Sequence, residues 1–351
     1  MKAQASSQPG TGTAVRALVT GGAGFIGSHL AEALIGAGCH VVVIDDLSTG
    51  SEVHLTDLPA SRLDLIRLPV AEGMAEAMRL GPCDEIYHLA AGVGVDLVLE
   101  HPAEVIEGSL RSISAVLDAA RQWRCPVLLA SSSEVYGKSD RVPFAEDDDV
   151  VYGPTTMTRW SYAYAKGMDE FVALAHHNRH GTNAVVARFF NTVGPRQSGA
   201  WGMVLPRFVG AALRDEPLRV FGDGRQTRCF CDVRDVVRLL PDLVRQAKCA
   251  GRVFNVGGDR LVTIRGLAEL VIRVLGSRSP IEMVPYSEAY APGFEDVAVR
   301  QPDLTRLRSA TGFEPTITLE QTIRDLGAWM RDSAERRAPL DPSVATARGI
   351  D

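Results

Sequence analysis

The sequence lacks any long hydrophobic run and any excess of positive charge. No apolar stretch approaches the roughly 18 residues that span a bilayer, and residues 1–14 contain no apolar segment typical of a secretory signal. Lysine and arginine total 37 against 43 aspartates and glutamates, so the formal net charge is −6. Because phosphate binding favours a basic surface, this balance argues against nucleic acid as a partner. We expect a cytoplasmic protein with no membrane or nucleic-acid partner.

Cysteine is also scarce, with six scattered residues in a chain of 351. This scatter favours reduced thiols over a disulfide framework. Cys229 and Cys231 have no second ligand pair at zinc spacing, and no carboxylate accompanies His176, His177 and His180 at the HExxH spacing. We therefore expect no metal site.

What the sequence does contain is a core-forming composition in an alternating pattern. Hydrophobic residues make up 46% and charged residues 23%, as in ordinary globular proteins. Short apolar runs alternate with stretches of helical period, which predicts βαβ units and an α/β fold with a doubly wound parallel sheet of the Rossmann type. The apolar runs are residues 17–20, 41–44, 63–68, 85–90, 127–130 and 184–189.

A glycine-rich turn follows the first predicted strand. Gly21, Gly24 and Gly27 stand between residues 16–20 and a predicted helix that continues to residue 37. Glycine at these three positions permits a tight turn, a close approach of the backbone to a pyrophosphate, and close packing of the helix on the strand. The helix N-terminus then faces the phosphates, so the pattern predicts a dinucleotide site.

The second predicted strand ends at Asp45 and Asp46, the first of which lies 18 residues after Gly27. An acidic side chain at this place accepts hydrogen bonds from the adenosine ribose and repels a 2′-phosphate. The cofactor is therefore expected to be NAD rather than NADP.

A second group of candidate residues combines hydroxyls with a lysine. Tyr162 and Lys166 are four residues apart on a predicted helix and share one face. An ammonium near a phenol lowers the pKa of the phenol, which suits a tyrosine acting as general base. The segment 131–137, SSSEVYG, follows a predicted strand at the sheet edge where parallel sheets place their chemistry. A run of hydroxyls is equally typical of a simple turn, and Glu134 of a residue that caps it.

Together these motifs resemble the extended short-chain dehydrogenase/reductase family of nucleotide-sugar epimerases, dehydratases and decarboxylases. The resemblance covers roughly residues 15–330. Its motifs are GGAGFIG at 21–27, DDLSTG at 45–50, YHLAA at 87–91, SSSEVYG at 131–137, YAYAK at 162–166, RFFNTVGPR at 188–196, FGDGRQTRCF at 221–230 and RQPDL at 300–304.

The resemblance implies a role for each matching residue. Tyr162 is expected to be the base, Lys166 to bind the nicotinamide ribose, and Ser132 to hydrogen-bond the reacting sugar hydroxyl, with Glu134 as a fourth catalytic residue. The implied NAD-binding residues are Gly21, Gly24, Phe25, Ile26, Gly27, Asp45, Asp46, Leu89, Ala90, Ala91, Tyr162, Lys166 and Phe189. The implied substrate-binding residues are Ser133, Asn191, Val204, Arg207, Phe221, Arg228, Asp296 and Arg300. For Arg207 and Arg300 an ordinary surface position is an equal alternative.

Two positions depart from the family pattern. Pro69 stands near the place of an aspartate that touches the adenine, and Ser109 stands where an asparagine is usual. We expect both to affect the adenine side of the cofactor and neither to touch the chemistry.

The expected division follows the same pattern, because the alternation of strands and helices fades near Gly194. Residues 15–193 are predicted to form the NAD-binding Rossmann domain. Residues 194–333 are predicted to be a smaller α+β region that binds the nucleotide sugar and returns some strands to the main sheet. Residues 1–14 and 334–351 are predicted to be flexible tails.

Family members share oxidation at the sugar C4 and differ in the fate of the 4-keto intermediate. The sequence SEVYG after Ser132 resembles UDP-glucuronate decarboxylases, so decarboxylation of that UDP-sugar is expected first, 4-epimerisation second and 4,6-dehydration third. A non-catalytic NAD sensor is a fourth alternative, but the chain keeps Tyr162, Lys166 and Ser132. Helices at about 102–123 and 158–179 carry apolar residues on more than one face, which predicts a homodimer. The resemblance implies that these two helices pair into a four-helix interface.

Overall fold

The computed structural model describes residues 14–91, 102–199, 203–289 and 297–337. Its centre is a sheet of seven strands in the order β11-β6-β5-β4-β1-β2-β3, and every neighbouring pair is parallel. The strands are β1 (Arg16–Thr20), β2 (His40–Ile44), β3 (Leu63–Ile66), β4 (Glu85–His88), β5 (Val127–Ser132), β6 (Ala184–Phe189) and β11 (Arg252–Val256). The predicted α/β class and parallel sheet are therefore confirmed.

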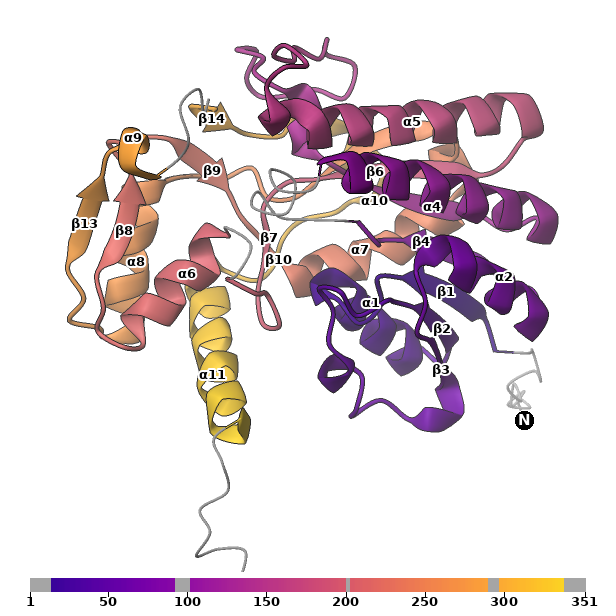
Figure 1. Ribbon diagram of the computed structural model, residues 1–351, viewed down its shortest axis with the longest axis horizontal. Helices are drawn as coiled ribbons and strands as arrows, with labels where there is room; N and C mark the ends of the chain where they lie inside the picture. Colours follow the sequence, from indigo (N-terminus) through magenta and orange to yellow (C-terminus); the bar gives the residue numbers. More distant parts are fainter. Residues whose placement is uncertain (1–13, 92–101, 200–202, 290–296, 338–351) are drawn as a thin grey trace, which may run out of the picture.

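Helices cover both faces of this sheet (Figure 1). One face packs against α1 (Phe25–Gly36), α7 (Val233–Arg245) and α10 (Thr305–Thr311). The other packs against α2 (Val70–Leu80), α4 (Pro102–Trp123) and α5 (Ser161–His180). Strands buried on both faces carry near-continuous apolar runs, and for this reason the strands could be predicted from the sequence.

The strand order reverses between β1 and β4, since β2 and β3 lie on one side of β1 and β4 on the other. In open parallel sheets the ligand crevice lies at the carboxyl ends of the strands at such a point. The glycine turn after β1 and the segment after β4 flank this place.

A smaller lobe follows, with its own apolar core formed by α6, α8, α11 and β8 (Figure 1). It includes the pair β8–β13 and a three-stranded sheet in the order β12-β9-β14, and β10 pairs with β7. Its elements and the two short strands are β7 (Thr192–Val193), α6 (Val204–Ala212), β8 (Leu218–Phe221), β9 (Thr227–Cys229), β10 (Cys231–Asp232), β12 (Leu261–Thr263), α8 (Ile264–Leu275), β13 (Ile281–Val284), α9 (Tyr286–Ala289), β14 (Val299–Arg300) and α11 (Leu319–Arg337). Helix α11 thus continues past residue 334, where a tail was expected.

Five single turns of 3₁₀ helix complete the described elements, and two of them carry candidate site residues. They are η1 (Glu52–His54), η2 (Ala60–Arg62), η3 (Ser133–Tyr136), η4 (Thr158–Trp160) and η5 (Ala247–Cys249). All six cysteines are buried free thiols. In the described ranges no helix is long and apolar enough to cross a membrane, and no group of three or more His, Cys, Asp or Glu side chains is arranged to hold a metal ion.

Candidate active site

The end of β5 places two candidate catalytic residues. The strand runs directly into η3, and the Ser132 hydroxyl caps this turn by accepting the Glu134 N–H at 3.2 Å. Tyr136 anchors the end of the turn in the protein interior, where its hydroxyl donates to Asn255 Oδ1 at 2.7 Å. Ser132 and Glu134 are therefore held at the carboxyl edge of the central sheet.

Glu134 lies between two guanidinium groups. Arg300 Nη1 donates to its Oε1 at 2.6 Å, and Arg159 Nη2 donates to its Oε2 at 2.7 Å. Burial by itself would raise the pKa of Glu134, but Arg300 and Arg159 outweigh it and lower the pKa to about 2. The site thus contains a fixed carboxylate and two fixed cations at the end of strand β5.

This geometry corrects two alternatives that the sequence left open. Arg300 is buried and faces the site, so the surface position considered for it is wrong. The Glu134 side chain pairs with arginines, while the cap of the turn is Ser132. Sequence reasoning missed Arg159, although its place in η4, three residues before Tyr162, was the available signal.

Tyr162 lies in the first turn of α5 beside Ser132, whose hydroxyl hydrogen-bonds to it and lowers its pKa. The net shift has the opposite sign, because burial, Glu134 and Asp169 all raise the pKa and outweigh that hydrogen bond. The predicted lowering of the Tyr162 pKa is therefore wrong for this structure. The phenol is protonated before ligands arrive.

The Lys166 ammonium has a protein partner that the sequence did not indicate. It pairs with the carboxylate of Asp169, with Nζ and Oδ2 3.3 Å apart, and both side chains are buried. Ser109 on α4 donates to the same oxygen at 2.6 Å. Ser109 therefore contacts the buried partner of Lys166, and Asp169 was not recognised from the sequence.

The glycine turn forms a cradle that side chains would fill. Gly21 has φ +69°, and a Cβ there would lie 2.8 Å from the Ala90 nitrogen. A Cβ at Gly27 would lie 2.0 Å from the Gly21 carbonyl oxygen. Gly24 caps α1 and has no side chain that could accept the first N–H groups of the helix. These features fit a dinucleotide whose pyrophosphate approaches the backbone.

The two acidic residues after β2 differ in their surroundings. Asp45 is buried and accepts the Ala23 and Leu47 N–H groups, both at 2.9 Å. Burial raises its pKa, although these two hydrogen bonds lower it. Asp46 is exposed and binds Ser48. Asp45 therefore belongs to the turn itself and holds a negative charge beside the cradle.

The other residues expected to contact NAD end or follow neighbouring strands. Phe25 and Ile26 open α1, Phe189 ends β6, and Leu89, Ala90 and Ala91 follow β4. The carboxyl ends of β1, β4 and β6 lie along one edge of the sheet, so the fold brings these residues to the side of the cradle.

The expected substrate-binding residues are spread along the second lobe and the strands leading to it. Asn191 Nδ2 donates to the Cys229 carbonyl at 2.8 Å, and Arg228 Nη1 donates to the Val297 carbonyl at the same distance. Ser133 is buried in η3, Val204 is the first residue of α6, and Phe221 is the last residue of β8. Arg207 is exposed and donates to the Gly199 carbonyl. Asp296 lies outside the described residues.

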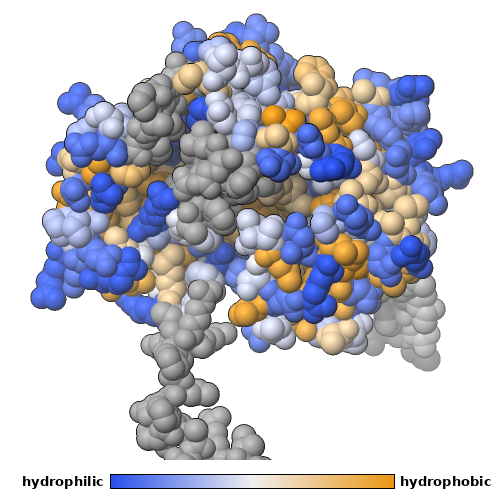
Figure 2. Space-filling view, viewed as in Figure 1, coloured by the Kyte–Doolittle hydropathy of each residue, from blue (hydrophilic) through white to orange (hydrophobic). Residues whose placement is uncertain are grey.

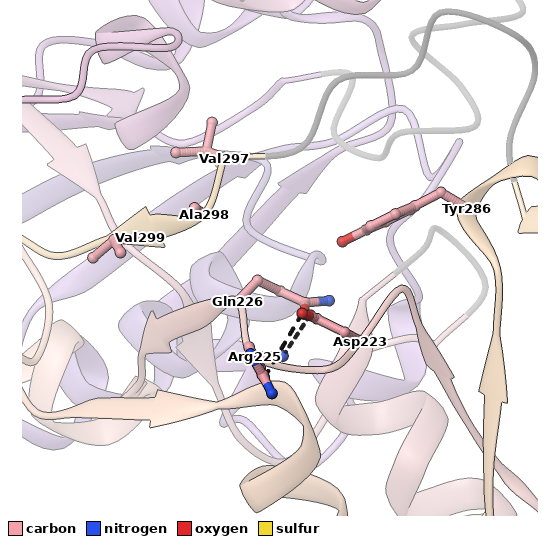
Figure 3. A pocket seen from close by; sticks show the side chains of 7 residues that line it. All are labelled: Asp223, Arg225, Gln226, Tyr286, Val297, Ala298 and Val299. Atoms are coloured by element: carbon pink, nitrogen blue, oxygen red, sulfur yellow. Dashed lines mark hydrogen bonds and ion pairs between the residues drawn. The ribbon is translucent and has the colours of Figure 1, made fainter.

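A cavity of about 350 Å³ lies between the loop that joins β8 to β9, the start of β14 and α9. Arg228 donates to the carbonyl of Val297, one of its lining residues. Figure 3 shows the side chains of Tyr286 and Gln226 pointing toward one another across it. Its lining residues are Asp223, Arg225, Gln226, Tyr286, Val297, Ala298 and Val299. An aromatic ring and an amide facing one small cavity suit a flat polar ring. Sequence reasoning missed Gln226 and Tyr286.

Comparison with known proteins agrees with this geometry. The sequence matches the NAD dependent epimerase/dehydratase family over residues 17–257. It is 36% identical over 318 residues to UDP-N-acetyl-alpha-D-glucosaminuronate decarboxylase of Bacillus cytotoxicus, covering 90% of this chain and 98% of that protein. It is 34% identical to UDP-glucuronic acid decarboxylase 1 of Arabidopsis thaliana, covering 88% and 68%. The crystal structure of UDP-glucose 4-epimerase from Thermotoga maritima with UDP-glucose superposes with a TM-score of 0.82 at 26% identity, covering 91% and 100%.

Fold, cradle and relatives together define an NAD-dependent enzyme. The chain belongs to the NAD dependent epimerase/dehydratase family, as the motifs indicated. NAD as the cofactor is confirmed at the level of this family.

We predict that NAD binds at least about tenfold more tightly than NADP, because the Asp45 charge repels a 2′-phosphate. Asp45→Asn removes the charge and keeps an oxygen that accepts the Ala23 N–H, so it should narrow this gap. Fluorescence titration with both cofactors measures it. Asp46→Asn is the comparison and should change the ratio less, since Asp46 is exposed. Equal affinity of the parent protein for both cofactors would contradict the prediction.

We also predict that Glu134 stabilises the fold in a pH-dependent way. Its pKa falls from 4.5 to about 2 on folding, so its contribution is present above pH 4.5 and is lost as the pH falls toward 2. Glu134→Gln should therefore lower the free energy of unfolding by about 3 kcal/mol at pH 7, with a gap that narrows below pH 4.5. Urea unfolding across this pH range measures it. Glu76→Gln, which alters an exposed pair with Arg79, is the control. A difference in unfolding free energy between the parent and Glu134→Gln that stays constant across this pH range would contradict the prediction.

Proposed function

We propose that this enzyme decarboxylates UDP-glucuronate through transient oxidation of the sugar at C4. The observation that carries the proposal is the group of Glu134, Arg159 and Arg300 beside Tyr162. A 4-epimerase reaction has no step that uses a carboxylate and two arginines next to the base. The two relatives with decarboxylase names, 36% and 34% identical, support the same choice.

The first step assigns roles to the residues at the start of α5 and the end of β5. Tyr162 takes the proton of the C4 hydroxyl, which Ser132 also hydrogen-bonds. NAD, when bound, would supply the acceptor for the C4 hydride and the donor for its return. The resting phenol is protonated, but an added positive charge nearby lowers a phenol pKa, and the oxidised nicotinamide ring carries such a charge. Lys166 adds a second positive charge on the same helix face.

The second step uses the arginines. Once C4 is a ketone, the C6 carboxylate is β to it, and CO₂ leaves while its bonding electron pair moves toward the C4 oxygen to give an enolate. A proton added at C5 then restores the C4 ketone, to which the hydride returns. Arg159 and Arg300 are two guanidinium groups that can bind a carboxylate with paired hydrogen bonds. Glu134 is ionised, so it repels the departing carboxylate and can pass on a proton only after taking one up.

The other end of the proposed substrate is a nucleoside diphosphate. The cavity between Gln226 and Tyr286 is of a size and polarity that suit the base. Arg228, on β9, and Asn191, between β6 and β7, are the proposed partners of the pyrophosphate, which a guanidinium favours. We also infer a cytoplasmic location, which agrees with six reduced, buried thiols.

We predict that, with NAD present, UDP-glucuronate yields a product lighter by one CO₂ in mass spectrometry. UDP-N-acetylglucosaminuronate belongs in the same panel, because a relative's name gives it as that protein's substrate. UDP-glucose should not change. Conversion of UDP-glucose at constant mass would establish 4-epimerisation instead, and loss of one water would establish dehydration.

Two variants control this experiment. Glu134→Gln should slow product formation by about 10²–10⁴-fold, as for other acid–base groups, while initial NADH formation survives. Tyr162→Phe should abolish both signals. Turnover of UDP-glucuronate by Glu134→Gln at the parent rate would show that Glu134 is structural and would favour the epimerase.

We further propose that the enzyme is a homodimer formed through α4 and α5. These helices pack side by side, and hydrophobic side chains gather on the surface over them (Figures 1 and 2). Helix α5 directs three large apolar side chains outward, with Tyr164 40%, Met168 51% and Phe171 73% exposed. A stripe of this kind at spacings of four and three residues suits a helical partner.

The expected result is a dimeric mass in light scattering at micromolar concentration. Phe171→Glu should shift the mass to that of a monomer by placing a charge in the interface. Met283→Glu places the same charge at a methionine on β13 that is 42% exposed, and it should leave the dimer intact. A parent protein that is monomeric at this concentration would refute the interface.

A further inference from the structure

A buried charge cluster lies behind the candidate catalytic lysine. Asp169 has no exposed surface, and Lys166 is 3% exposed. The Asp169 Oδ2 atom meets Lys166 Nζ at 3.3 Å and accepts the Ser109 hydroxyl at 2.6 Å. The cluster thus joins α4 to the helix that carries Tyr162.

Asp169 differs from its neighbour Glu170, which is also buried. Glu170 is fully engaged by Arg188 through two hydrogen bonds and by Ser131 through a third. The Asp169 Oδ1 atom is buried and has no hydrogen-bond partner within the described ranges. A buried carboxylate oxygen that lacks a partner is costly, and a purely structural pair would be better satisfied. A functional role is therefore needed to explain why a carboxylate is buried at residue 169.

We propose that Asp169 is a positioning residue that holds the Lys166 ammonium in one place and offsets its charge beside Tyr162. A lysine side chain carries a compact charge on a flexible stem of four carbons. A single fixed carboxylate can therefore hold the ammonium in one position. Ser109 in turn fixes that carboxylate from α4. The inference deepens the proposed function, because it rests on Tyr162 and Lys166 forming the reaction site.

The charge balance gives the cluster a measurable consequence. Oxidised nicotinamide carries a positive charge that reduced nicotinamide lacks. A fixed negative charge behind Lys166 reduces the repulsion between the ammonium and the oxidised ring, and has little effect on the neutral reduced ring. Asp169 therefore favours NAD over NADH, which helps the hydride to leave the cofactor again at the end of each turnover.

The decisive experiment compares the affinities of the protein for NAD and NADH. Asp169→Asn keeps the shape and removes the charge, so the ratio Kd(NAD)/Kd(NADH) should rise by about tenfold, equal to about 1.4 kcal/mol. Asp118→Asn makes the same change of charge at an exposed place on α4 and should leave the ratio unchanged. If Asp169 were merely structural, Asp169→Asn would weaken the binding of NAD and of NADH by the same factor. An unchanged ratio of the two Kd values would therefore overturn the proposal.

A thermal unfolding cycle without cofactor tests the pairing separately from the reaction. Lys166→Met leaves the Asp169 charge buried without its cation and should lower the melting temperature. Adding Asp169→Asn to that variant should restore most of the loss. If the two substitutions changed the melting temperature additively, an energetic interaction between Lys166 and Asp169 would be refuted. If both experiments succeed while UDP-glucuronate is not decarboxylated, the proposed reaction fails and the role of Asp169 stands.

Discussion

The buried ion pair of Arg188 and Glu170 fixes the relative position of the elements that carry the site. Arg188, in β6, binds the carboxylate of Glu170 on α5 through Nε at 2.9 Å and Nη2 at 2.7 Å. Ser131, at the end of β5, donates to the same carboxylate. Removing one partner of such a pair leaves a buried charge uncompensated, which is strongly destabilising. The distance between Ser132 on the strand and Tyr162 on the helix depends on this contact.

Around that fixed frame, each charge at the site has a partner of opposite sign before any ligand arrives. Glu134 is held by Arg159 and Arg300, and Lys166 is held by Asp169. Tyr162 lies within the field of two carboxylates, which helps to raise its pKa. A substrate carboxylate therefore enters a site whose arginines already have a partner, and it must compete with Glu134 for them. This competition couples substrate binding to a change in the environment of the tyrosine.

Helix α5 has an arrangement opposite to that of an ordinary surface helix. Its inner face carries the buried charges of Lys166, Asp169 and Glu170, whereas Met168 and Phe171 face outward. Periodicity alone predicts the helix and a surplus of apolar surface. It does not reveal which acid on the inner face pairs with which cation, because Asp169 and Glu170 are adjacent in the sequence and reach different partners.

The sequence by itself determined the parallel sheet, the glycine cradle and the family. Strands buried on both faces need continuous apolar runs, and a pyrophosphate needs backbone without side chains close to it. Both features can therefore be recognised from the types of neighbouring residues in the sequence. Only the tertiary structure decided the charge pairing. Arg300 reaches Glu134 across 166 positions of the chain, and Ser109 reaches Asp169 from another helix. Electrostatic shifts depend on distance and burial in space, and local spacing therefore predicted the wrong sign for the pKa of Tyr162.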